Sequence, residues 1–464
     1  MTRTASLYRA FAECAHAHRG LKAFVSLSGM PEDAQELTYG DALWRISCLS
    51  ALLPDAPGAA ALILGPKTAD TILWQLACNL KGLVFAPCDG ALPEPRVREL
   101  VGRLQPAVII GPEDKCPSLA SFDLRGEKDS HRVWVSENFR RWPEQTSHIV
   151  FSSGSTGKPK AILLPADPVI AVTREQARLT GLGPGKRFGW LLSPAFDASL
   201  SDAYSTLLSG ACLYVANFSM SRVKKLVRFF TEGGITHTDL SPAILALVPP
   251  HEVPSLESVV FGGELAPESA VQQWRHAGKK LFNAYGPTEA TICTSFGEVD
   301  DSWVPSDIGT PFPGVTYRME PTGAEGVREL WIGGTHLALG YDDPQLTAHR
   351  FVLDEDNQRF FRTGDVCELS ASGRYHFKGR ADRQFKHLGI LVCPEEIEQK
   401  ALAMGCHEAV LRREDDKMIL YVAGGPSPDE LRRRLREALP SGLVPHFCKS
   451  VSALPRNITG KVAL

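Results

Sequence analysis

Residues 151–161 read FSSGSTGKPKA, a loop-like stretch enclosed by two short apolar runs. Ile149, Val150 and Phe151 lead into it, and residues 162–164, ILL, lead out of it. Short apolar runs bounded by Gly and Pro are typical of buried strands. The sequence therefore predicts a strand–loop–strand element here.

The loop between these strands has the chemistry of a polyphosphate cradle. Gly allows successive backbone N–H groups to turn toward one point, Ser and Thr add side-chain donors, and Lys supplies positive charge. The candidate phosphate-binding residues are Ser152, Ser153, Gly154, Ser155, Thr156, Gly157 and Lys160. By itself, the same composition also fits a flexible surface hairpin.

The loop is not a Walker A motif, in which four residues separate the first Gly from a Gly-Lys-Ser/Thr that opens a helix. Here two residues separate Gly154 from Gly157, Pro159 follows Lys158, and a strand pattern follows the loop. Any phosphate site in this loop is therefore of another type.

The bulk composition is that of an ordinary globular protein. At 464 residues the chain is too long for one core, which suggests two or three subdomains. Fifty basic and 53 acidic residues give a net charge of −3, which indicates neither a nucleic-acid nor an anionic-membrane partner. The basic run at residues 432–436 follows a capping box at Ser427 and Glu430, so we expect a solvated helix face.

The eleven cysteines contain no CxxC pair and no metal-ligand spacing. No secretory h-region opens the chain, and its apolar stretches are too short for a membrane span. These features predict a reducing, cytoplasmic setting.

The order of predicted elements indicates an α/β protein with layered subdomains. Residues 1 to about 145 alternate helical patterns with short apolar runs, such as 60–64 and 107–110. The alternation recurs from about 186 to 290, with strand candidates at 213–215 and 259–261. Such alternation predicts a largely parallel sheet covered by helices.

The composition changes in the last third of the chain. From about 305 to 380, Gly, Pro and short β-like runs dominate, so a small β-rich subdomain is expected. The last 80 or so residues are predicted to form a separate small α+β domain. The predicted domains are residues 1–381, an N-terminal core, and residues 382–464.

Three further segments combine turns with reactive side chains. Residues 283–289, NAYGPTE, would present Tyr to a base, Thr to a phosphate and Glu to Mg²⁺ around a Gly-Pro turn. Residues 361–365, FRTGD, place a carboxylate after a glycine turn, which suits ribose hydroxyls. Residues 454–461, LPRNITGK, set Lys461 on a turn. Each fragment alone also fits an ordinary turn or a solvated tail.

Taken together in this order, the segments resemble the adenylate-forming superfamily. That superfamily includes acyl-CoA synthetases, luciferases and the adenylation domains of nonribosomal peptide synthetases, and the chain looks closest to free-standing examples of the last. The resemblance covers nearly the whole chain. It includes LTYGDAL at 37–43, LKGLVFAP at 80–87, ELWIGG at 329–334, LGY at 339–341 and GRAD at 379–382.

The resemblance implies a reaction and a set of nucleotide contacts. Such enzymes join a carboxylate to the AMP part of ATP, release pyrophosphate and then pass the acyl group to a thiol. Lys461 would bridge carboxylate and nucleotide, Thr288 would contact the α-phosphate, and Glu289 would hold Mg²⁺. Tyr285 would stack on adenine and Asp365 would take the ribose hydroxyls. The other implied nucleotide-binding residues are Gly263, Glu264, Asn283, Gly286 and Arg380.

In the superfamily the second step needs a rotation of the C-terminal domain. The resemblance therefore implies that residues 382–464 form a mobile lid, with Asp382 as its hinge.

Asp197 in the segment FDAS, residues 196–199, distinguishes subclasses of the superfamily. In amino-acid-activating domains an Asp here pairs with the substrate α-ammonium, and a buried carboxylate needs such a cation. Aryl and fatty acyl-CoA synthetases generally lack it. The alternative is a helix N-cap or a structural Asp at a strand end. An α-amino acid is therefore favoured over a plain carboxylic acid.

The resemblance also implies a substrate pocket, carried over by motif register. Its residues are Asp197, Ala198, Ser201, Asp239, Val260, Gly262, Ala284, Ile292 and Cys293. Ser201 and Gly262 are expected to leave room for a side chain that is not small. Val260, Ile292 and Cys293 make an apolar floor that resembles pockets for aromatic amino acids.

Asp239 departs from a purely apolar pocket. If buried, this carboxylate needs a donor, such as an indole or aniline N–H or a cationic head group. We therefore expect an aromatic amino acid with a nitrogen-bearing side chain, with Arg or Lys as the alternative.

The chain departs from the superfamily after Lys386. Residues 387–393 read HLGILVC, and Leu388 and Leu391 replace two arginines. The lid surface used for thiol transfer is therefore expected to be altered. The chain stops three residues after Lys461, so the expected partner is a separate carrier protein with a phosphopantetheine arm. Two alternatives stay open: a carboxylate–CoA ligase, and a degenerate homologue that binds without catalysis.

Overall fold

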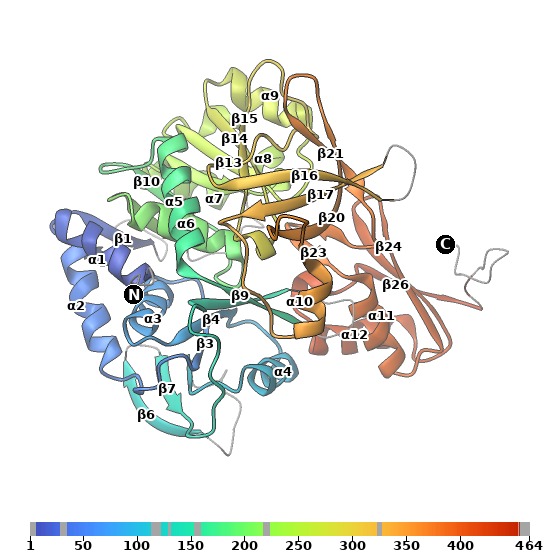
Figure 1. Cartoon of the computed structure of the whole chain (residues 1–464), viewed down its shortest axis with the longest axis horizontal. Helices are drawn as coiled ribbons and strands as arrows, with labels where there is room; N and C mark the ends of the chain where they lie inside the picture. Colours follow the sequence, from blue (N-terminus) through green and yellow to red (C-terminus); the bar gives the residue numbers. More distant parts are fainter. Residues whose placement is uncertain are drawn as a thin grey trace. The chain divides into compact units, whose positions relative to one another are not determined.

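The computed structural model describes residues 6–27, 35–112, 122–128, 131–152, 159–216, 223–322, 327–452 and 454 (Figure 1). These residues form two compact units. The first lies within Met1–Gly90, Leu104–Val150 and Ile162–Ala381, and the second within Ala91–Arg103, Phe151–Ala161 and Asp382–Leu464. The division of functions between residues 1–381 and 382–464 stays a prediction.

The first unit contains an eight-stranded sheet that carries the predicted substrate pocket. Its spatial order is β15-β14-β13-β12-β10-β11-β1-β2. The strands are β1 (Lys22–Leu27), β2 (Gln35–Thr38), β10 (Arg187–Trp190), β11 (Cys212–Ala216), β12 (His237–Leu240), β13 (Ser258–Gly262), β14 (Lys280–Tyr285) and β15 (Ser295–Glu298). Six of them are parallel, and the edge strands β2 and β15 are antiparallel to their neighbours.

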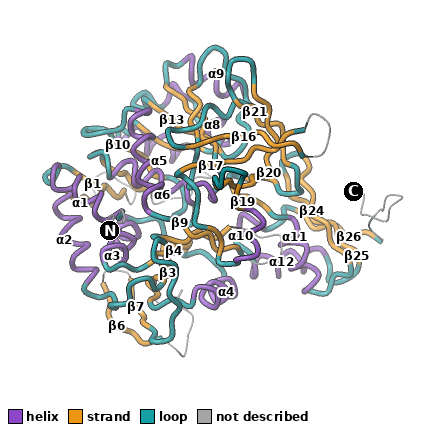
Figure 2. Tube along the Cα trace, viewed as in Figure 1, coloured by secondary structure: helices purple, strands orange, loops and turns teal. Residues whose placement is uncertain are grey.

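Successive parallel strands are connected by α6 (Asp197–Leu207), α7 (Val223–Gly233), α8 (Pro242–Leu247) with the 3-10 turn η3 (Pro250–Glu252), and α9 (Glu268–His276), as the alternation in the sequence predicts. α5 (Ala166–Thr180) precedes β10, and the 3-10 turn η4 (Thr288–Ala290) lies between β14 and β15. Figure 2 shows α5 and α6 packed side by side. In such sheets, ligands bind beyond the carboxyl ends of the strands.

A second eight-stranded sheet has the order β18-β9-β8-β4-β3-β5-β7-β6. Its strands are β3 (Ala60–Gly65), β4 (Val84–Asp89), β5 (Val108–Gly111), β6 (Asp123–Lys128), β7 (His131–Val135), β8 (His148–Ser152), β9 (Lys160–Leu164) and β18 (Gly340–Tyr341). Nearby in the chain are α1 (Leu7–Ala17), α2 (Tyr39–Ser50), α3 (Ala69–Leu80) and α4 (Glu94–Leu104). β8 and β9 enclose residues 153–159, so the strands predicted around the loop are confirmed.

The helices of this part begin where the sequence offers side-chain caps. Thr38 caps α2, and Asp41 completes a capping box by accepting the Thr38 backbone N–H. Thr68 caps α3 in the same way, since its hydroxyl accepts the Thr71 N–H. These caps satisfy backbone donors that a helix leaves unpaired at its start.

The β-rich subdomain predicted for residues 305–380 is a five-stranded antiparallel sheet. It comprises β16 (Val315–Pro321), β17 (Arg328–Gly334), β19 (Phe351–Leu353), β20 (Arg359–Leu369) and β21 (Tyr375–Arg380), with α10 (Pro344–Arg350). β16, β17 and β20 lie side by side in Figure 1. The Asp365–Arg380 register joins β20 and β21.

The second unit has its own α+β fold. It contains the hairpin β22 (Phe385–His387) and β23 (Ile390–Val392), and a three-stranded sheet of β24 (Glu408–Glu414), β25 (Lys417–Ala423) and β26 (Phe447–Val451). Helices α11 (Pro394–Ala403) and α12 (Pro428–Ala438) and the turn η5 (Ser441–Leu443) complete it. Apolar residues of these helices and strands form a core of this unit's own. The predicted mixed α/β fold, with a β-rich subdomain and a small α+β domain, is confirmed.

The basic run on α12 is a solvated helix face, as expected. Ser427 accepts the Glu430 N–H and caps the helix. Within the described residues, the Glu430 carboxylate pairs with Arg433 and Arg434, which are exposed. Such exposed pairs contribute little to stability.

Candidate active site

Three parallel strands of the first unit end at the predicted substrate pocket. Asp239 on β12 lies beside Val260 on β13, and Gly262 on β13 lies beside Ala284 on β14. Because these positions are near the carboxyl ends of their strands, the sheet brings them to one edge. The register carried over from the motifs therefore agrees with the pairing of the strands.

Helix α6 presents a second wall at the same edge. It begins at Asp197, directly after Phe196, which occupies the cap position without a side-chain bond. Asp197 is therefore not the N-cap, although its Oδ1 accepts the Ala198 N–H at 2.9 Å. Ser201 follows one turn later, and its hydroxyl donates to Gln176 Oε1 on α5. A carboxylate in the first turn is also stabilised by the helix dipole.

The structure gives a reason for Gly262 that is separate from the room it was expected to leave. A Cβ built at this position would lie 2.3 Å from the carbonyl oxygen of Ala284. The absence of a side chain is thus required by the close approach of β13 and β14. Ser201 likewise directs its hydroxyl to Gln176, so neither residue by itself shows how large a substrate side chain can be.

The predicted apolar floor comes from a strained segment. Thr291 and Ile292 have φ values of 55° and 71°, in the left-handed region. Ile292 and Cys293 are both buried. Left-handed β-branched residues are costly and gather at functional sites. A Cβ on Gly286 would lie 2.4 Å from Cys293 Cα, so the Gly286 turn packs directly on this segment.

Asp239 has charged neighbours that the sequence did not single out. Burial raises its pKa to about 7. Asp202 on α6 is fully buried, and burial raises its pKa well above the ordinary value, with Asp239 raising it further and Lys67 lowering it. Its position four residues after Ala198 places both on one helix face, a signal that could have identified it. Nothing in the sequence around Lys67 indicates this role.

The predicted ribose and adenine residues form a bonded group in the first unit. Tyr285 Oη donates to Asp365 Oδ2 at 2.6 Å, and Arg380 Nη1 lies 2.6 Å from Asp365 Oδ1. Burial and the nearby Asp365 carboxylate raise the pKa of Tyr285 well above its usual value, so it stays a donor.

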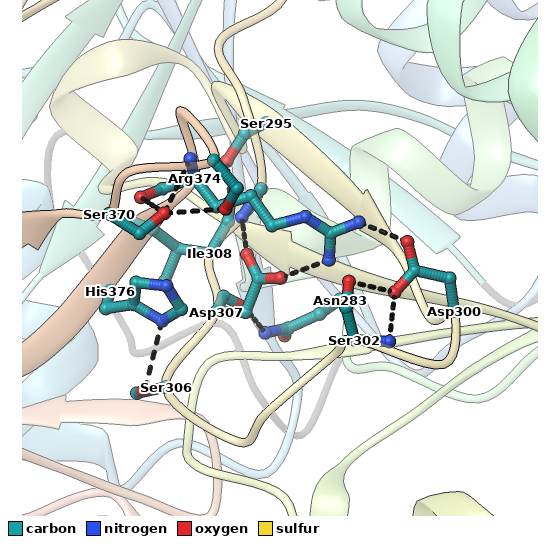
Figure 3. Close-up of polar contacts among 12 residues, drawn as sticks. Asn283, Ser295, Asp300, Ser302, Ser306, Asp307, Ile308, Ser370, Arg374 and His376 are labelled. Carbon is teal, nitrogen blue, oxygen red and sulfur yellow. Dashed lines mark hydrogen bonds and ion pairs between the residues drawn. The ribbon is translucent and has the colours of Figure 1, made fainter.

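A polar network supports the strand that carries Tyr285. Figure 3 shows the Arg374 guanidinium between Asp307 and Asp300, with Asn283 beside Asp307. Asn283 Nδ2 donates to the Asp307 carbonyl oxygen at 2.6 Å, and Asp307 Oδ1 accepts the Gly309 N–H. One end of Asn283 is therefore occupied by the protein. Its predicted nucleotide contact stays a prediction for the other end.

Glu289 occupies a buried position in η4, one residue after Thr288. Its Oε1 accepts a 2.7 Å hydrogen bond from Tyr341 Oη, which fixes the carboxylate. Within the described residues, no group of three or more His, Cys, Asp or Glu side chains could hold a metal ion. Mg²⁺ commonly takes one or two carboxylates together with phosphate oxygens, so Glu289 fits such a site only with a nucleotide present.

Orphaned polar atoms occur where the nucleotide is expected. Glu264 Oε1, next to Gly263, is buried without a hydrogen-bond partner in the described part of the chain. In the second unit, the Ser152 hydroxyl is also buried without a hydrogen-bond partner among the described residues, and Lys160 is buried. Buried polar atoms without partners are unusual in proteins and indicate a missing partner such as a ligand.

Several predicted residues lie outside the described residues. They are Ser153, Gly154, Ser155, Thr156, Gly157 and Lys461. Asp382, the predicted hinge, opens the second unit and accepts the Gln384 N–H through its carboxylate. Leu388, which replaces a superfamily arginine, is exposed at a φ of 50° in the β22–β23 turn. Among the described helices, none is long and apolar enough to cross a membrane.

Comparisons with known proteins agree with this geometry. The family described as AMP-binding enzyme matches residues 11–342. Phosphinothricin tripeptide synthetase PhsC of Streptomyces viridochromogenes is 31% identical over 441 residues, which cover 88% of this chain and 40% of that protein. Delta-poly-L-ornithine synthetase of Acinetobacter baumannii is 29% identical, covering 93% and 34%. The chain thus spans less than half of these two relatives.

Other relatives are closer to this chain in length. Novobiocin biosynthesis protein H of Streptomyces niveus is 29% identical over 480 residues, covering 92% of this chain and 78% of that protein. Among solved structures, IdnL1 has a TM-score of 0.83 at 24% identity, covering 97% and 99% of the two chains. The fused adenylation–PCP protein NpsA-ThdA from Klebsiella oxytoca has a TM-score of 0.83 at 22% identity, covering 97% and 94%.

These structural likenesses concern the fold. The family match extends over more than half of the chain, and it includes the phosphate loop, the α6 segment and the Tyr285–Glu289 turn. The chain therefore belongs to the AMP-binding enzyme family and is an adenylate-forming ligase.

Proposed function

We propose that the chain activates an α-amino acid with ATP as aminoacyl-AMP, releases pyrophosphate and passes the aminoacyl group to the phosphopantetheine thiol of a separate carrier protein. The observation that carries the proposal is the position of Asp197. It opens α6 at the sheet edge where Asp239 and Gly262 lie. A carboxylate there can pair with an α-ammonium, which a plain carboxylic acid lacks.

The nucleotide roles follow the contacts of the first unit. The Asp365 carboxylate, oriented by Tyr285 and Arg380, would accept the ribose hydroxyls. Because the Tyr285 hydroxyl is engaged with Asp365, its ring face stays the part available for adenine. Thr288 would contact the α-phosphate, and Glu289 would hold Mg²⁺ together with phosphate oxygens. Mg²⁺ supplies Lewis-acid stabilisation of the charge that develops on the phosphate.

The remaining chemical roles belong to residues 152–157, Lys160 and Lys461. The loop would hold the β- and γ-phosphates through backbone and hydroxyl donors. Repulsion between the substrate carboxylate and the α-phosphate is the main barrier to bringing these two anions together. Lys461 would reduce it by placing a positive charge between them. The lid, residues 382–464, would then rotate about Asp382 for thiol transfer. The proposed location of the reaction is the cytoplasm.

A carrier partner is supported by the proteins that this chain resembles. NpsA-ThdA and PA1221 are both named as proteins with adenylation and PCP domains. Phosphinothricin tripeptide synthetase and linear gramicidin synthase are named as synthetases of peptides. An exposed Leu388 on the hairpin of the second unit would make the carrier contact more apolar than an arginine does.

The side chain of the amino acid is proposed to carry nitrogen, because Asp239 needs a donor. An aromatic amino acid with a ring or side-chain nitrogen fits the Val260, Ile292 and Cys293 floor. Arg or Lys is the alternative, and one relative is named as a poly-L-ornithine synthetase. A carboxylate–CoA ligase is the competing activity, and the half-buried Asp197 carboxylate at the start of α6 disfavours it.

Amino-acid-dependent ATP–pyrophosphate exchange tests the proposal. The panel should contain the common amino acids, nitrogen-bearing aromatic amino acids and their deaminated counterparts. Exchange with an amino acid, but not with its deaminated acid, supports the role of Asp197. The opposite preference contradicts it and favours the CoA ligase, which CoA-dependent AMP release would then detect.

A further inference from the structure

Asp202 is a buried carboxylate to which no role has been given. Its side chain is fully buried in α6, and both of its oxygens lack a hydrogen-bond partner among the described residues. A carboxylate removed from water without partners is costly, and proteins keep such groups where a ligand completes them. The helix itself does not need it, since Thr206 and Ser205 bond only its backbone oxygen.

The Asp202 side chain lies in the electrostatic range of Asp239. The two come from different elements, α6 and β12. Asp202 lies four residues beyond Ala198, so the two share one face of the helix, the face predicted to line the pocket. The pKa of Cys293 is raised by burial and by the nearby carboxylates of Asp197 and Asp239. The second carboxylate is therefore part of the same polar end of the pocket.

Lys67 approaches this pair from the other eight-stranded sheet. It follows β3, and its Nζ donates to the Leu191 carbonyl oxygen at 2.7 Å. Burial lowers the pKa of Lys67 to about 8, and the Asp202 and Asp89 carboxylates oppose that shift. Asp89 in turn accepts a 2.6 Å hydrogen bond from Ser193. The ammonium is thus anchored by the Leu191 carbonyl oxygen and acts on Asp202 through its charge, not through a hydrogen bond.

When Asp202 and Asp239 are both ionised, their two negative charges exceed the single positive charge of Lys67. Burial raises the pKa of both carboxyls, so a bound cation would favour their ionised forms. A neutral N–H donor would satisfy one oxygen but would leave the negative charge in place. An ammonium or guanidinium would satisfy the hydrogen bond and the charge together.

We propose that Asp202 and Asp239 together bind a positively charged side chain of the amino acid substrate, an ammonium or a guanidinium, and that Lys67 positions Asp202. The proposal rests on the proposed amino-acid activation and selects the basic alternative over the aromatic one. Asp202 and Asp239 are thereby specificity-determining residues, and Lys67 acts only through Asp202.

The test compares substrates that differ only in charge. Exchange is measured with L-arginine against L-citrulline, and with L-lysine and L-ornithine against L-norleucine. We expect one basic amino acid to exceed its uncharged counterpart in kcat/KM by at least about ten-fold, the scale of one charge-assisted bond. 4-Aminophenylalanine and tryptophan are included, and a preference for either of them over every basic amino acid overturns the proposal.

Variants then separate specificity from folding. Asp202→Asn should raise the KM for the basic amino acid about ten-fold or more while the KM for ATP changes less than about two-fold. Its melting temperature should not fall, because an uncompensated buried charge is removed. Lys67→Met should show the same KM pattern in weaker form. Asp55→Asn, at an exposed residue outside this site, is the matched control.

Deaminated substrates distinguish failure of this inference from failure of the proposed function. 6-Aminohexanoate keeps the side-chain cation and lacks the α-ammonium, and hexanoate lacks both. Activity on 6-aminohexanoate alone would support the Asp202–Asp239 site and contradict the role of Asp197. Amino-acid activity with an unchanged charge preference in Asp202→Asn would contradict only the inference. Silence toward every acid contradicts both.

Discussion

Tyr285 and Asp365, 80 residues apart in the chain, are joined by a 2.6 Å hydrogen bond from the phenol to the carboxylate. Both were predicted to contact the nucleotide, one at the base and the other at the ribose. The bond means that the predicted adenine platform, Tyr285, and the predicted ribose acceptor, Asp365, are held together. Arg380 completes it from β21.

Replacing Tyr285 with Phe removes this donor and keeps the ring. The Asp365 carboxylate then loses the restraint that Tyr285 provides, so the KM for ATP should rise about ten-fold while the KM for the amino acid changes little. Tyr421→Phe is a matched control, because Tyr421 also donates to a carboxylate, Glu414, at 2.8 Å. Titration of ATP in the exchange assay measures the effect, and equal KM values for ATP in both variants would refute it.

Lys461 is expected to carry the chemistry rather than the fold. Lys461→Ala should lower kcat for adenylation about 100- to 1,000-fold, the usual loss when an electrostatic stabiliser is removed. The circular dichroism spectrum and melting temperature should stay those of the wild type. Lys225→Ala, on the exposed face of α7, is the control. Retained exchange in the Lys461 variant would remove this lysine from the mechanism.

Asp197 is expected to act on the amino acid and not on ATP. Asp197→Ala should raise the KM for the amino acid by about ten-fold or more, because the α-ammonium loses its carboxylate partner. Asp197→Asn keeps the bond to the Ala198 N–H but not the charge, so it should show nearly the same loss. Steady-state exchange at saturating ATP measures both. Parallel rises in the two KM values would indicate a structural role.

The charge of Asp239 should give the pocket a pH dependence. Its pKa of about 7 means that the carboxylate ionises between pH 6 and 8. In addition to burial, the Asp239 carboxylate raises the pKa of Asp202 on α6, and Lys67 lowers it. Besides burial, Asp197 and Asp239 both raise the pKa of Cys293, in the segment after η4. The kcat/KM for a basic amino acid should therefore rise over this range. Asp239→Asn should make kcat/KM nearly independent of pH over this range. An unchanged pH profile in this variant would show that Asp239 does not cause the pH dependence.

The same shift has a consequence for stability. The folded-state pKa of about 7 lies above the ordinary value of 3.8, so the folded chain binds this proton more tightly than the unfolded chain. The stabilisation is complete below pH 3.8 and is lost as the pH rises through 7. Melting curves at pH 5 and pH 8 should differ less for Asp239→Asn than for the wild type.

Substitution of Gly262 tests why this position carries no side chain: because β13 and β14 approach closely, or because the pocket needs the volume. Gly262→Ala would place a Cβ 2.3 Å from the Ala284 oxygen, so the strands must separate. We expect a loss of about 1–3 kcal/mol in the free energy of unfolding. Gly102→Ala, in α4 with no atom within 4 Å of its Cβ, should instead stabilise by about 0.5–1 kcal/mol. Urea denaturation measures both, and a stable Gly262→Ala would restore the volume explanation.

Much of the fold could be predicted from local pattern. The apolar runs at 60–64, 213–215 and 259–261 fall within β3, β11 and β13, because buried parallel strands need continuous apolar residues. The Gly and Pro boundaries around residues 151–161 marked β8 and β9 for the same reason. The motif register predicted that Asp239 and Ala284 lie near one edge of the sheet, and the parallel pairing of β12, β13 and β14 agrees with it.

The interactions between distant segments were decided only by the tertiary structure. Asp202 and Lys67 carry no motif, and their relation to Asp239 depends on a helix and two sheets meeting at one point. The Tyr285–Asp365 hydrogen bond depends on the approach of β14 to β20. The need for glycine at position 262 depends on how closely β13 and β14 approach each other. Local propensity and spacing determine which elements form and which residues share a face. Electrostatic environment and steric contact depend on groups that the chain brings together only when it folds.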